Sequence, residues 1–569
     1  MTVDAQLRTE VEAWLDDDPD ERDQAELRAL LARGDDEAGA ELADRFAGRL
    51  TFGTAGLRGA VGAGPNRMNR AVVRGTTAAL ARWLLGRGRG IAGTGAAEAG
   101  VVIGCDARHR SDEFADEAAR VLAGAGIRVH LLPRQQPTPL LAFAIRHLHA
   151  AAGIMITASH NPPAYNGYKL YLRDGAQIIP PADAEIEAAT RDIGPLAQIP
   201  AAQPDSPLIS RHGDEIAVAY LDAVCAVSPA PPGAAWLRFV YTPLHGVAAG
   251  LALRAFEQAG FAEPDVVAAQ AAPDPDFPTV AFPNPEEPGA LDLALAQARR
   301  SGAELVLAND PDGDRLAVAV PDPEVPGGWR TLTGDQVGAL LGAYLLGQDR
   351  AGPDAGGRLV ATTIVSSTLL SRIAAAAGAQ YAETLTGFKW IVRAGEPRTD
   401  IRFVFGYEEA LGYAVGDTVR DKDGIGAALA LLGLAARARS GGESLTDAYD
   451  ALEAAHGVHL TAQLTAATVT PVDVMARLRA ASPAELAGET VAAITDLTGG
   501  TRDLPSADVL SYRLAGARVV IRPSGTEPKI KAYLEVVEPV LGGRLAEARR
   551  AARSRMDLLL AAVTQLLDS

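Results

Sequence analysis

Three segments of the chain share one pattern of apolar and polar positions. Each begins with a short apolar run, passes through a loop of small residues into a stretch with apolar residues at helical spacing, and ends in a second apolar run; they span residues 99–132, 236–267 and 357–385. A strand, a crossover helix and a parallel strand produce this pattern. The chain is therefore predicted to contain three related α/β domains. The most apolar segment, 426–436, is predicted to be a buried helix.

The C-terminal part of the chain has a different pattern. From about residue 454 it shows strand-like runs, such as 517–523 and 530–537, without a clear strand–helix–strand unit. These runs predict a smaller α+β domain. Breaks are indicated by Pro and Gly clusters at 199–207 and 320–328 and by an acidic, Gly-containing stretch at 440–453. The predicted domains are therefore 1–205, 206–325, 326–450 and 451–569.

Composition narrows the possible classes of function. The 53 basic and 71 acidic residues give a net charge of −18, which argues against a nucleic-acid or anionic-membrane surface. No apolar run in the sequence approaches the ~20 residues needed to cross a membrane. The acidic N-terminus lacks the features of a secretory signal, and the two cysteines, Cys105 and Cys225, suit a reducing compartment. We therefore expect a cytoplasmic protein, and the net charge does not exclude anionic small molecules as ligands, because a site needs only a local cluster of basic residues.

Lysine is rare in this chain. Only five of the 53 basic residues are lysine: Lys169, Lys389, Lys422, Lys529 and Lys531. Lysine can lose its proton when its pKa is lowered, whereas arginine cannot, and it presents a compact charge. Four of the five lie in or beside loops that carry other candidate residues, although chance in a biased composition could explain any single one.

The stretch "ANDPDGDRLAV" is a candidate metal site. Asp310, Asp312 and Asp314 follow an apolar strand, with Pro and Gly between them to tighten the turn. Crowded carboxylates repel one another unless a cation is present, and hard oxygen ligands suit Mg²⁺. An EF-hand is excluded because Arg315 and Pro321 replace its glycine and glutamate. The fixed charge of Arg315 beside a metal suits a phosphate.

Other loops carry groups suited to sugar phosphates. Arg522, Ser524, Gly525 and Thr526 could form an anion nest, with a plain polar hairpin as the alternative. Glu408, after a strand, suits sugar hydroxyls, although a solvated glutamate is the commoner case. Gly387 and Lys389 form a further candidate contact. The glycine-rich loop 51–69 carries Arg58 and lacks the pattern of an ATP-binding P-loop.

The stretch "ITASHNPPAYNGYKLY" places Ser159 beside His160 in a loop rich in Pro, Asn and Gly. The G-x-S-x-G elbow of serine hydrolases is missing, so a hydrolase triad has little support. Neighbouring side chains usually point apart along a chain, so a direct Ser–His pair is not expected.

The motifs "TASHNPPAYNGYK", "DPDGDR", "GYEEALG" and "RPSGTEPK", in this order, resemble those of the α-D-phosphohexomutase superfamily. The resemblance spans nearly the whole chain and implies four domains around a central active-site cleft. It implies that Ser159 is carried as phosphoserine and that Mg²⁺, one per active site, is held by Ser159, Asp310, Asp312 and Asp314. It also implies that Lys169 and Arg58 assist proton transfer at the sugar hydroxyl, with a lysine whose pKa is lowered by nearby cations as one candidate base. His160, next to the serine, is a further candidate catalytic residue. Substrate contacts would come from Arg315, Gly387, Lys389, Glu408, Arg522, Ser524, Gly525 and Thr526.

The resemblance implies a phosphohexomutase that moves a phosphoryl group between C1 and C6 of glucose or mannose phosphates. A hexose 1,6-bisphosphate would be both intermediate and activator. Ala410 stands where many phosphoglucomutases have a serine, so the sugar loop does not fix the sugar. The alternatives are a phosphopentomutase, a hexose-1,6-bisphosphate synthase or a catalytically silent sugar-phosphate-binding regulator. We expect a monomer or small homo-oligomer.

Overall fold

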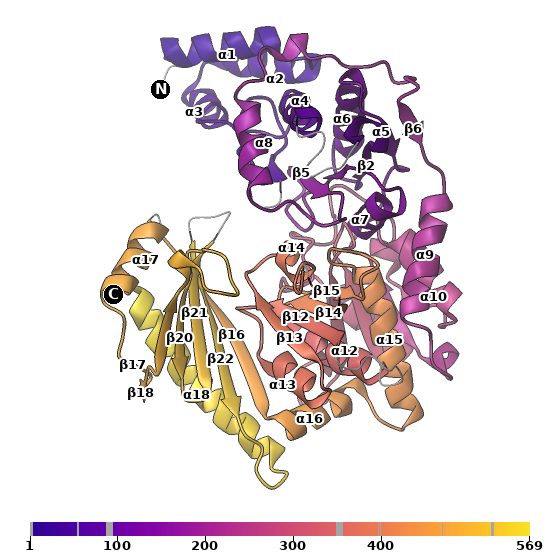
Figure 1. The fold of residues 1–569 in the computed structure, drawn as a ribbon, viewed down its shortest axis with the longest axis vertical. Helices are drawn as coiled ribbons and strands as arrows, with labels where there is room; N and C mark the ends of the chain where they lie inside the picture. The colour runs from indigo at the N-terminus through magenta and orange to yellow at the C-terminus, as the bar shows by residue number, and fades with distance from the viewer. Residues whose placement is uncertain are drawn as a thin grey trace. The chain divides into compact units, whose positions relative to one another are not determined.

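The computed structural model describes residues 4–53, 56–86, 95–348, 357–396, 398, 400–468, 470–524 and 529–568. They form two compact units. Unit 1 comprises residues 1–229, 238–317 and 418–428, and unit 2 comprises 230–237, 318–417 and 429–569. Figure 1 shows the elements in chain order. No helix in the described ranges is long and apolar enough to span a membrane.

A six-stranded mixed sheet forms the centre of the first domain. Its order is β1 (Gly56–Ala60), β5 (Tyr165–Leu172), β4 (Ala152–Ile156), β2 (Val101–Cys105), β3 (Val129–Leu131) and β6 (Ile209–Arg211). Strands β4, β2, β3 and β6 are parallel, so their carboxyl ends share one edge. The helices of this region are α4 (Arg70–Gly86), α5 (Ala96–Ala99), α6 (Ser111–Gly124), α7 (Thr138–His147), α8 (Ala182–Thr190) and α9 (Glu215–Val227).

The three predicted strand–helix–strand units are confirmed. The first is β2, α6 and β3. The second is β7 (Phe239–Thr242), α10 (Ala249–Ala259) and β8 (Asp265–Val266), and the third is β12 (Arg358–Thr363), α13 (Leu369–Ala376) and β13 (Gln380–Thr384). In each unit the two strands pair in parallel. Short, fully buried apolar strands such as β2 and β12 are typical of sheets covered on both faces.

The second and third sheets contain the other two strand–helix–strand units. The second has the order β11 (Trp329–Thr331), β10 (Leu316–Pro321), β9 (Leu305–Asn309), β7 and β8, with α11 (Asp292–Ser301) before β9. The third has the order β13, β12, β14 (Arg402–Glu408) and β15 (Gly412–Val415). Helices α12 (Gly334–Gln348), α14 (Phe388–Ile391), α15 (Gly424–Ser440) and α16 (Leu445–His456) belong to the same part of the chain. The predicted buried helix at 426–436 lies within α15.

The C-terminal domain is an antiparallel sheet with a long helix. The strand order is β16 (Val458–Ala467), β22 (Lys529–Glu538), β21 (Ala517–Pro523), β20 (Leu510–Leu514) and β19 (Ala493–Asp496). A small hairpin, β17 (Glu485–Leu486) and β18 (Glu489–Thr490), and the helix α17 (Pro471–Ala480) complete it. Helix α18 (Leu545–Asp568) packs along β22 and β16 (Figure 1). The α+β prediction is confirmed.

Three N-terminal helices were not among the sequence predictions. They are α1 (Ala5–Asp17), α2 (Glu21–Arg33) and α3 (Asp36–Arg45), each preceded by an Asp whose side chain accepts a backbone N–H of the first turn. Their apolar faces form a small core around Val11, Leu27 and Leu42. This packing makes the acidic N-terminal segment an ordered part of unit 1.

Candidate active site

The loop after strand β4 presents Ser159. The backbone N–H of Ser159 donates to Thr157 Oγ1 over 2.9 Å, and the φ of Ser159, 53°, lies in the left-handed region. The residue is only 3% exposed. Its hydroxyl donates to Asp310 Oδ2 over 2.8 Å. The serine loop and the acidic loop, identified separately in the sequence, therefore meet at a buried hydrogen bond.

The expectation that Ser159 and His160 point apart is wrong. Ser159 Oγ lies 3.2 Å from His160 Nδ1. The left-handed backbone at Ser159 is the physical reason, because alternation of neighbouring side chains holds for an extended chain with negative φ. Burial, followed by the charges of Arg315 and Arg58, lowers the pKa of His160 well below its ordinary value. A neutral imidazole thus lies within reach of the serine hydroxyl.

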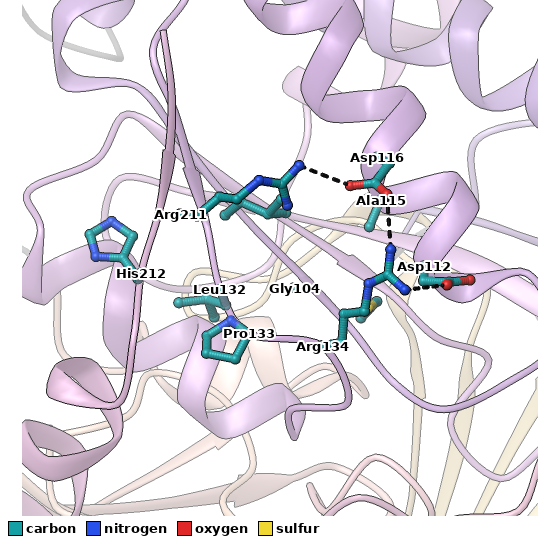
Figure 2. Close-up of a pocket in the computed structure, with 11 residues that line it drawn as sticks. Gly104, Asp112, Ala115, Asp116, Leu132, Pro133, Arg134, Arg211 and His212 are labelled. Atoms are coloured by element: carbon teal, nitrogen blue, oxygen red, sulfur yellow. Dashed lines mark hydrogen bonds and ion pairs between the residues drawn. The ribbon is translucent and has the colours of Figure 1, made fainter. Parts of the chain in front are cut away.

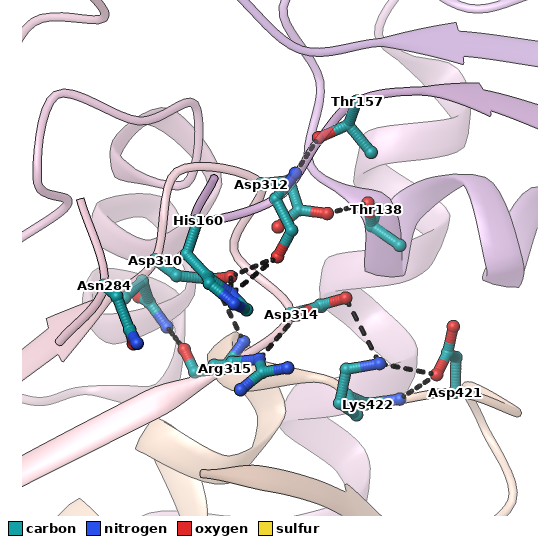
Figure 3. Close-up of polar contacts among 12 residues, drawn as sticks. Thr138, Thr157, His160, Asn284, Asp310, Asp312, Asp314, Arg315, Asp421 and Lys422 are labelled. Atoms are coloured by element: carbon teal, nitrogen blue, oxygen red, sulfur yellow. Dashed lines mark hydrogen bonds and ion pairs between the residues drawn. The ribbon is translucent and has the colours of Figure 1, made fainter. Parts of the chain in front are cut away.

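The three aspartates of the acidic loop are gathered at one point after strand β9. All are fully buried, and one carboxylate oxygen from each lies within 4.8 Å of the others. Asp312 Oδ2 accepts from Thr138 Oγ1 and from Lys169 Nζ, each over 2.7 Å. Lys169 also donates to Asp314 over 3.0 Å. Figure 3 shows Asp310, Asp312 and Asp314, with Thr138 next to Asp312.

The cluster has the properties of a divalent cation site. Asp312 Oδ1 and Asp314 Oδ1 are buried without a hydrogen-bond partner, although buried carboxylate oxygens normally have one. Burial, with Asp312 and Asp314 next to it, raises the pKa of Asp310 well above its ordinary value. A hard cation would satisfy the unpaired oxygens and favour the ionised form of Asp310, so the residues present fit Mg²⁺.

Lys169 differs from the expectation that nearby cations lower its pKa. Burial and Lys422 lower the pKa, but the carboxylates of Asp312, Asp314 and Asp421 outweigh them and raise it above the ordinary value. Lys169 is therefore a charged partner of the acidic cluster in the structure.

Lys422 is a member of this site that the sequence analysis singled out only by its rarity. Its ammonium lies 3.3 Å from Asp314 Oδ2 and 3.2 Å from Asp421 Oδ1 (Figure 3). Asp421 Oδ2 in turn accepts from the Tyr171 hydroxyl over 2.7 Å. Two of the five lysines thus flank Asp314, which the scarcity of lysine could have suggested.

Two arginines complete the surroundings of the serine. Arg58, on β1, donates from Nη1 to Asn161 Oδ1 in the serine loop over 2.9 Å. The backbone N–H of Arg315 donates to Asp310 Oδ1 over 2.9 Å, and its guanidinium lies near Asp314 and Glu286. One cluster in unit 1 therefore brings together the three aspartates and the predicted residues Ser159, His160, Lys169, Arg58 and Arg315. Such a cluster can hold a phosphoryl group and a metal together.

The predicted sugar loop lies in unit 2, after strand β14. Glu409 is tied into the interior, because its Oε2 accepts from Ser366 Oγ over 2.8 Å and from Thr363 Oγ1 over 3.2 Å. Burial and the charge of Asp335 raise the pKa of Glu409. Glu408 and Glu409 are both partly exposed. The Glu409 carboxylate is thus occupied by hydrogen bonds to hydroxyl groups of its own domain.

Gly387 and Lys389 lie at the start of α14 in the same unit. The φ of Gly387, 112°, strongly favours glycine. Lys389 is 6% exposed, and its ammonium lies 5.9 Å from the centre of the Trp390 ring. The glycine therefore allows the sharp turn that places Lys389 within the fold.

The predicted anion loop lies between strands β21 and β22 of unit 2. The Ser524 N–H donates to Lys529 O over 2.8 Å. Burial raises the pKa of Tyr533 above its ordinary value, and the nearby charges of Glu409 and Glu408 also raise it. The charge of Arg522 and its hydrogen bond to Tyr533 lower this pKa without reversing the shift. The sugar loop and Arg522 thus both approach Tyr533. Gly525 and Thr526 lie outside the described residues.

A separate hollow of about 190 Å³ lies at the carboxyl ends of β2 and β3 in unit 1 (Figure 2). Arg134 lines it and contacts Asp112 over 2.9 Å and Asp116 over 3.3 Å. Arg211 lies 3.8 Å from Asp116. The arginines of this hollow therefore already contact carboxylates. None of the catalytic, substrate-binding or metal-binding residues predicted from the sequence lines it.

Comparison with known families finds four consecutive matches. All are to phosphoglucomutase/phosphomannomutase: alpha/beta/alpha domain I over residues 49–196, domain II over 219–326, domain III over 333–455 and the C-terminal domain over 474–552. The matched domains follow the order of the four motifs.

Known proteins of this kind align over most of the chain. A Haemophilus influenzae protein named "Probable phosphomannomutase" is 41% identical over 82% of this chain and 93% of its own. A Schizosaccharomyces pombe protein named "Probable phosphoribomutase" is 37% identical over 94% of each. The crystal structure of a "putative phosphomannomutase" from Thermus thermophilus superposes with a TM-score of 0.65 at 27% identity, covering 92% of this chain and 100% of that one.

Proposed function

Because the chain belongs to the phosphoglucomutase/phosphomannomutase family and is thus a phosphosugar mutase, we propose that it interconverts the 1- and 6-phosphates of a hexose, glucose or mannose. In this proposal Ser159 carries the phosphoryl group, and the intermediate is a hexose 1,6-bisphosphate. The observation that supports it most directly is the 2.8 Å hydrogen bond between Ser159 Oγ and Asp310 within a buried triad of carboxylates.

In the first transfer, the bond between phosphorus and Ser159 Oγ breaks as a bond forms to the free hydroxyl oxygen of the sugar phosphate, and Ser159 Oγ takes up a proton as it leaves. The hydroxyl proton passes to a base, and His160, Lys169 and Arg58 are the candidates near the serine. The raised pKa of Lys169 in the absence of metal makes it a poor base in that state, whereas His160 is held neutral 3.2 Å from the oxygen. In the second transfer the other phosphate returns to Ser159, whose proton leaves by the reverse route.

Mg²⁺ would be held by Asp310, Asp312, Asp314 and an oxygen of the phosphoserine. When bound, it would neutralise charge on the transferring phosphoryl group. Thr138 and Lys169 orient Asp312 through hydrogen bonds of 2.7 Å each. Arg315 adds a permanent positive charge beside the aspartates. This chain would therefore contribute mainly alignment and charge, which are the main requirements of phosphoryl transfer.

Recognition of the non-reacting part of the substrate is proposed for unit 2. Glu408, with Gly387 and Lys389, would contact the sugar, and Arg522, Ser524, Gly525 and Thr526 would hold the distal phosphate. The hydrogen bonds from Ser366 and Thr363 to the Glu409 carboxylate support the choice of Glu408, because they occupy the side chain of its neighbour. Turnover requires the bisphosphate to present each phosphate to Ser159 in turn.

A pentose phosphate is the second candidate substrate. Ala410 removes the hydroxyl that many phosphoglucomutases place in the sugar loop, and the S. pombe relative, aligned over 94% of the chain, is named for a ribose phosphate. A hexose-1,6-bisphosphate synthase or a silent binder would share much of the same site.

A substrate panel tests the proposal. The purified protein with Mg²⁺ is given glucose, mannose, ribose or deoxyribose 1-phosphate, each with the matching bisphosphate, and products are followed by ³¹P NMR. The highest kcat/KM for a hexose supports the proposal. The highest value for a pentose transfers the assignment to a phosphopentomutase. Turnover of none of the four contradicts both.

A further inference from the structure

We propose that Arg108 is the positioning residue of the reactive serine, because its guanidinium holds the backbone of the loop that presents Ser159. The proposal rests on the function of Ser159 proposed above. Arg108 lies in the loop between β2 and α6, about fifty residues before the serine, and belongs to none of the four motifs that identify the family.

The side chain of Arg108 is almost fully buried and points its donors at the serine loop. Its Nη2 donates to Ser159 O over 2.6 Å and to Asn161 O, and its Nη1 donates to Pro162 O over 2.9 Å and to Tyr165 O over 3.1 Å. Four carbonyls of a seven-residue stretch therefore converge on one guanidinium. Only arginine offers enough fixed donors for this arrangement, since lysine has three donors around a single atom.

Within the serine loop the backbone makes two turn hydrogen bonds, from Asn161 N–H to Ala158 O and from Tyr165 N–H to Pro162 O. Pro162 and Pro163 have no N–H, so the hydrogen bonds of a strand or helix cannot form there. Ser159 is held at a φ of 53°, which a non-glycine residue adopts only when its surroundings impose it. The bond from Arg108 to Ser159 O acts on this residue directly. The guanidinium thus helps to fix the direction in which Ser159 Oγ meets Asp310.

Arg108 is itself anchored on two further sides. Its Nε lies 3.4 Å from Asp106 Oδ2, and Asp106 Oδ1 accepts from the Arg108 N–H over 3.0 Å and from Ser111 Oγ over 2.6 Å. Its guanidinium carbon lies 5.0 Å from the centre of the Phe277 ring. The Arg108 guanidinium is therefore held in position by its contacts with Asp106 and Phe277.

The N-terminal helices extend this anchor. Arg110, two residues on and at a φ of 63°, donates to Asp23 Oδ1 over 2.6 Å and to Asp20 Oδ2 over 2.5 Å. Asp20 precedes α2 and Asp23 lies in its first turn, in a segment before residue 49, where the family match begins. These ion pairs thus connect the acidic N-terminal segment to the loop that carries Arg108.

The test measures transfer at Ser159 separately from binding. Wild type, Arg108→Lys and Arg108→Ala are loaded with phosphate from glucose 1,6-bisphosphate, and single-turnover transfer to glucose 1-phosphate is followed by rapid quench. Because a displacement of about 1 Å can cost ~100-fold in rate, both variants are expected to lose transfer rate on that scale, with KM unchanged. Millimolar guanidinium, but not an equal concentration of methylammonium, should restore part of the rate of Arg108→Ala.

Arg134→Gln serves as the matched control, because Arg134 is an exposed arginine in the loop after β3 that contacts only Asp112 and Asp116 among the charged residues described. It should transfer phosphate at the wild-type rate. If Arg108→Ala does not fold, the proposal is tested with Arg108→Lys and Arg110→Gln instead. A reduced transfer rate with an unchanged KM in both of these variants supports the proposal.

Wild-type transfer rates in the Arg108 variants, or a loss that appears only in KM, would overturn it. A wild-type protein that never carries phosphate on Ser159 would instead contradict the proposed function. The two failures are thus distinguishable.

Discussion

Ser159 donates its hydroxyl hydrogen to Asp310 Oδ2 over 2.8 Å, although 151 positions separate the two residues in the sequence. The bond joins the loop after β4 to the loop after β9, and it is buried. It places the proposed phosphoryl carrier directly against the proposed metal ligands, which is the arrangement that the proposed mechanism requires.

Asp310→Asn tests the metal site. Burial and the charges of Asp312 and Asp314 raise the pKa of Asp310, so exchanging its carboxylate for a neutral amide should cost little thermal stability in a chelator. Loss of a charged ligand should abolish the stabilisation by Mg²⁺ and reduce kcat by about 10³-fold. Thermal unfolding with and without Mg²⁺, beside activity, measures both. Asp276→Asn, at an exposed aspartate, is the control, and a Mg²⁺ response of wild-type size in Asp310→Asn would exclude Asp310 as a ligand.

Lys169→Met tests the charge balance of the cluster. Lys169 bonds to Asp312 over 2.7 Å and to Asp314 over 3.0 Å, all within the interior. Removing one partner of a buried ion pair costs about 3–5 kcal/mol of unfolding free energy. We expect a lower melting temperature in chelator and a larger increase on adding Mg²⁺ than in wild type, because the cation replaces the lost charge. Arg211→Met, at an exposed arginine, should show neither effect. Equal Mg²⁺ responses in wild type and Lys169→Met would contradict the prediction.

Asp423→Asn tests a pH dependence. Burial raises the pKa of Asp423 from 3.8 to about 6, although the carboxylate accepts from Gly426 N–H, the Tyr220 hydroxyl and Ile425 N–H. The folded protein therefore binds this proton more tightly than the unfolded chain. The contribution of Asp423 to stability is fully present below about pH 4, falls as the pH rises towards 6 and stays constant above it.

The difference amounts to about 3 kcal/mol, at about 1.4 kcal/mol for each pKa unit. The asparagine side chain of the variant can keep all three hydrogen bonds through its amide oxygen and has no charge to bury. The urea midpoint of Asp423→Asn should thus increase relative to that of wild type as the pH rises from 4 to 7.5. Parallel pH profiles for the two proteins would exclude a shifted pKa at this position.

Glu408→Gln tests the sugar loop. If Glu408 binds sugar hydroxyls, loss of its charge should raise KM for the sugar phosphate by ~10–100-fold, as expected for a hydrogen bond to a charged group. The melting temperature should not change, since Glu408 is partly exposed. Steady-state kinetics measures KM, with the exposed Glu443→Gln as control. An unchanged KM would leave recognition of the sugar to other residues.

Much of the fold follows from local patterns in the sequence. Apolar runs such as Val101–Cys105, followed by helical spacing of apolar residues in 111–124, are enough to predict the strand–helix–strand units. The candidate loops follow such strands, so their positions were predictable too. The N-terminal helices were not predicted, because their small core depends on packing between segments.

The detailed geometry of the site depends on contacts between distant residues. Nothing near Lys422 in the sequence indicates that it reaches Asp314, and the four carbonyls bound by Arg108 lie more than fifty residues away. The closeness of Ser159 and His160 depends on one positive φ, which Pro, Asn and Gly nearby suggest but do not specify. The chemistry of each loop was thus predictable, and the family resemblance also implied that Ser159 meets the three aspartates, whereas the partners of Lys422 and Arg108 were not predictable.

The most direct test of the central proposal is mass spectrometry of the purified protein beside Ser159→Ala, before and after incubation with glucose 1,6-bisphosphate and Mg²⁺. The proposed mechanism predicts one phosphate on the wild-type peptide that contains Ser159, exchanging with label from the bisphosphate, and none on the variant. A wild-type peptide that stays unphosphorylated after this treatment would contradict the phosphoserine mechanism.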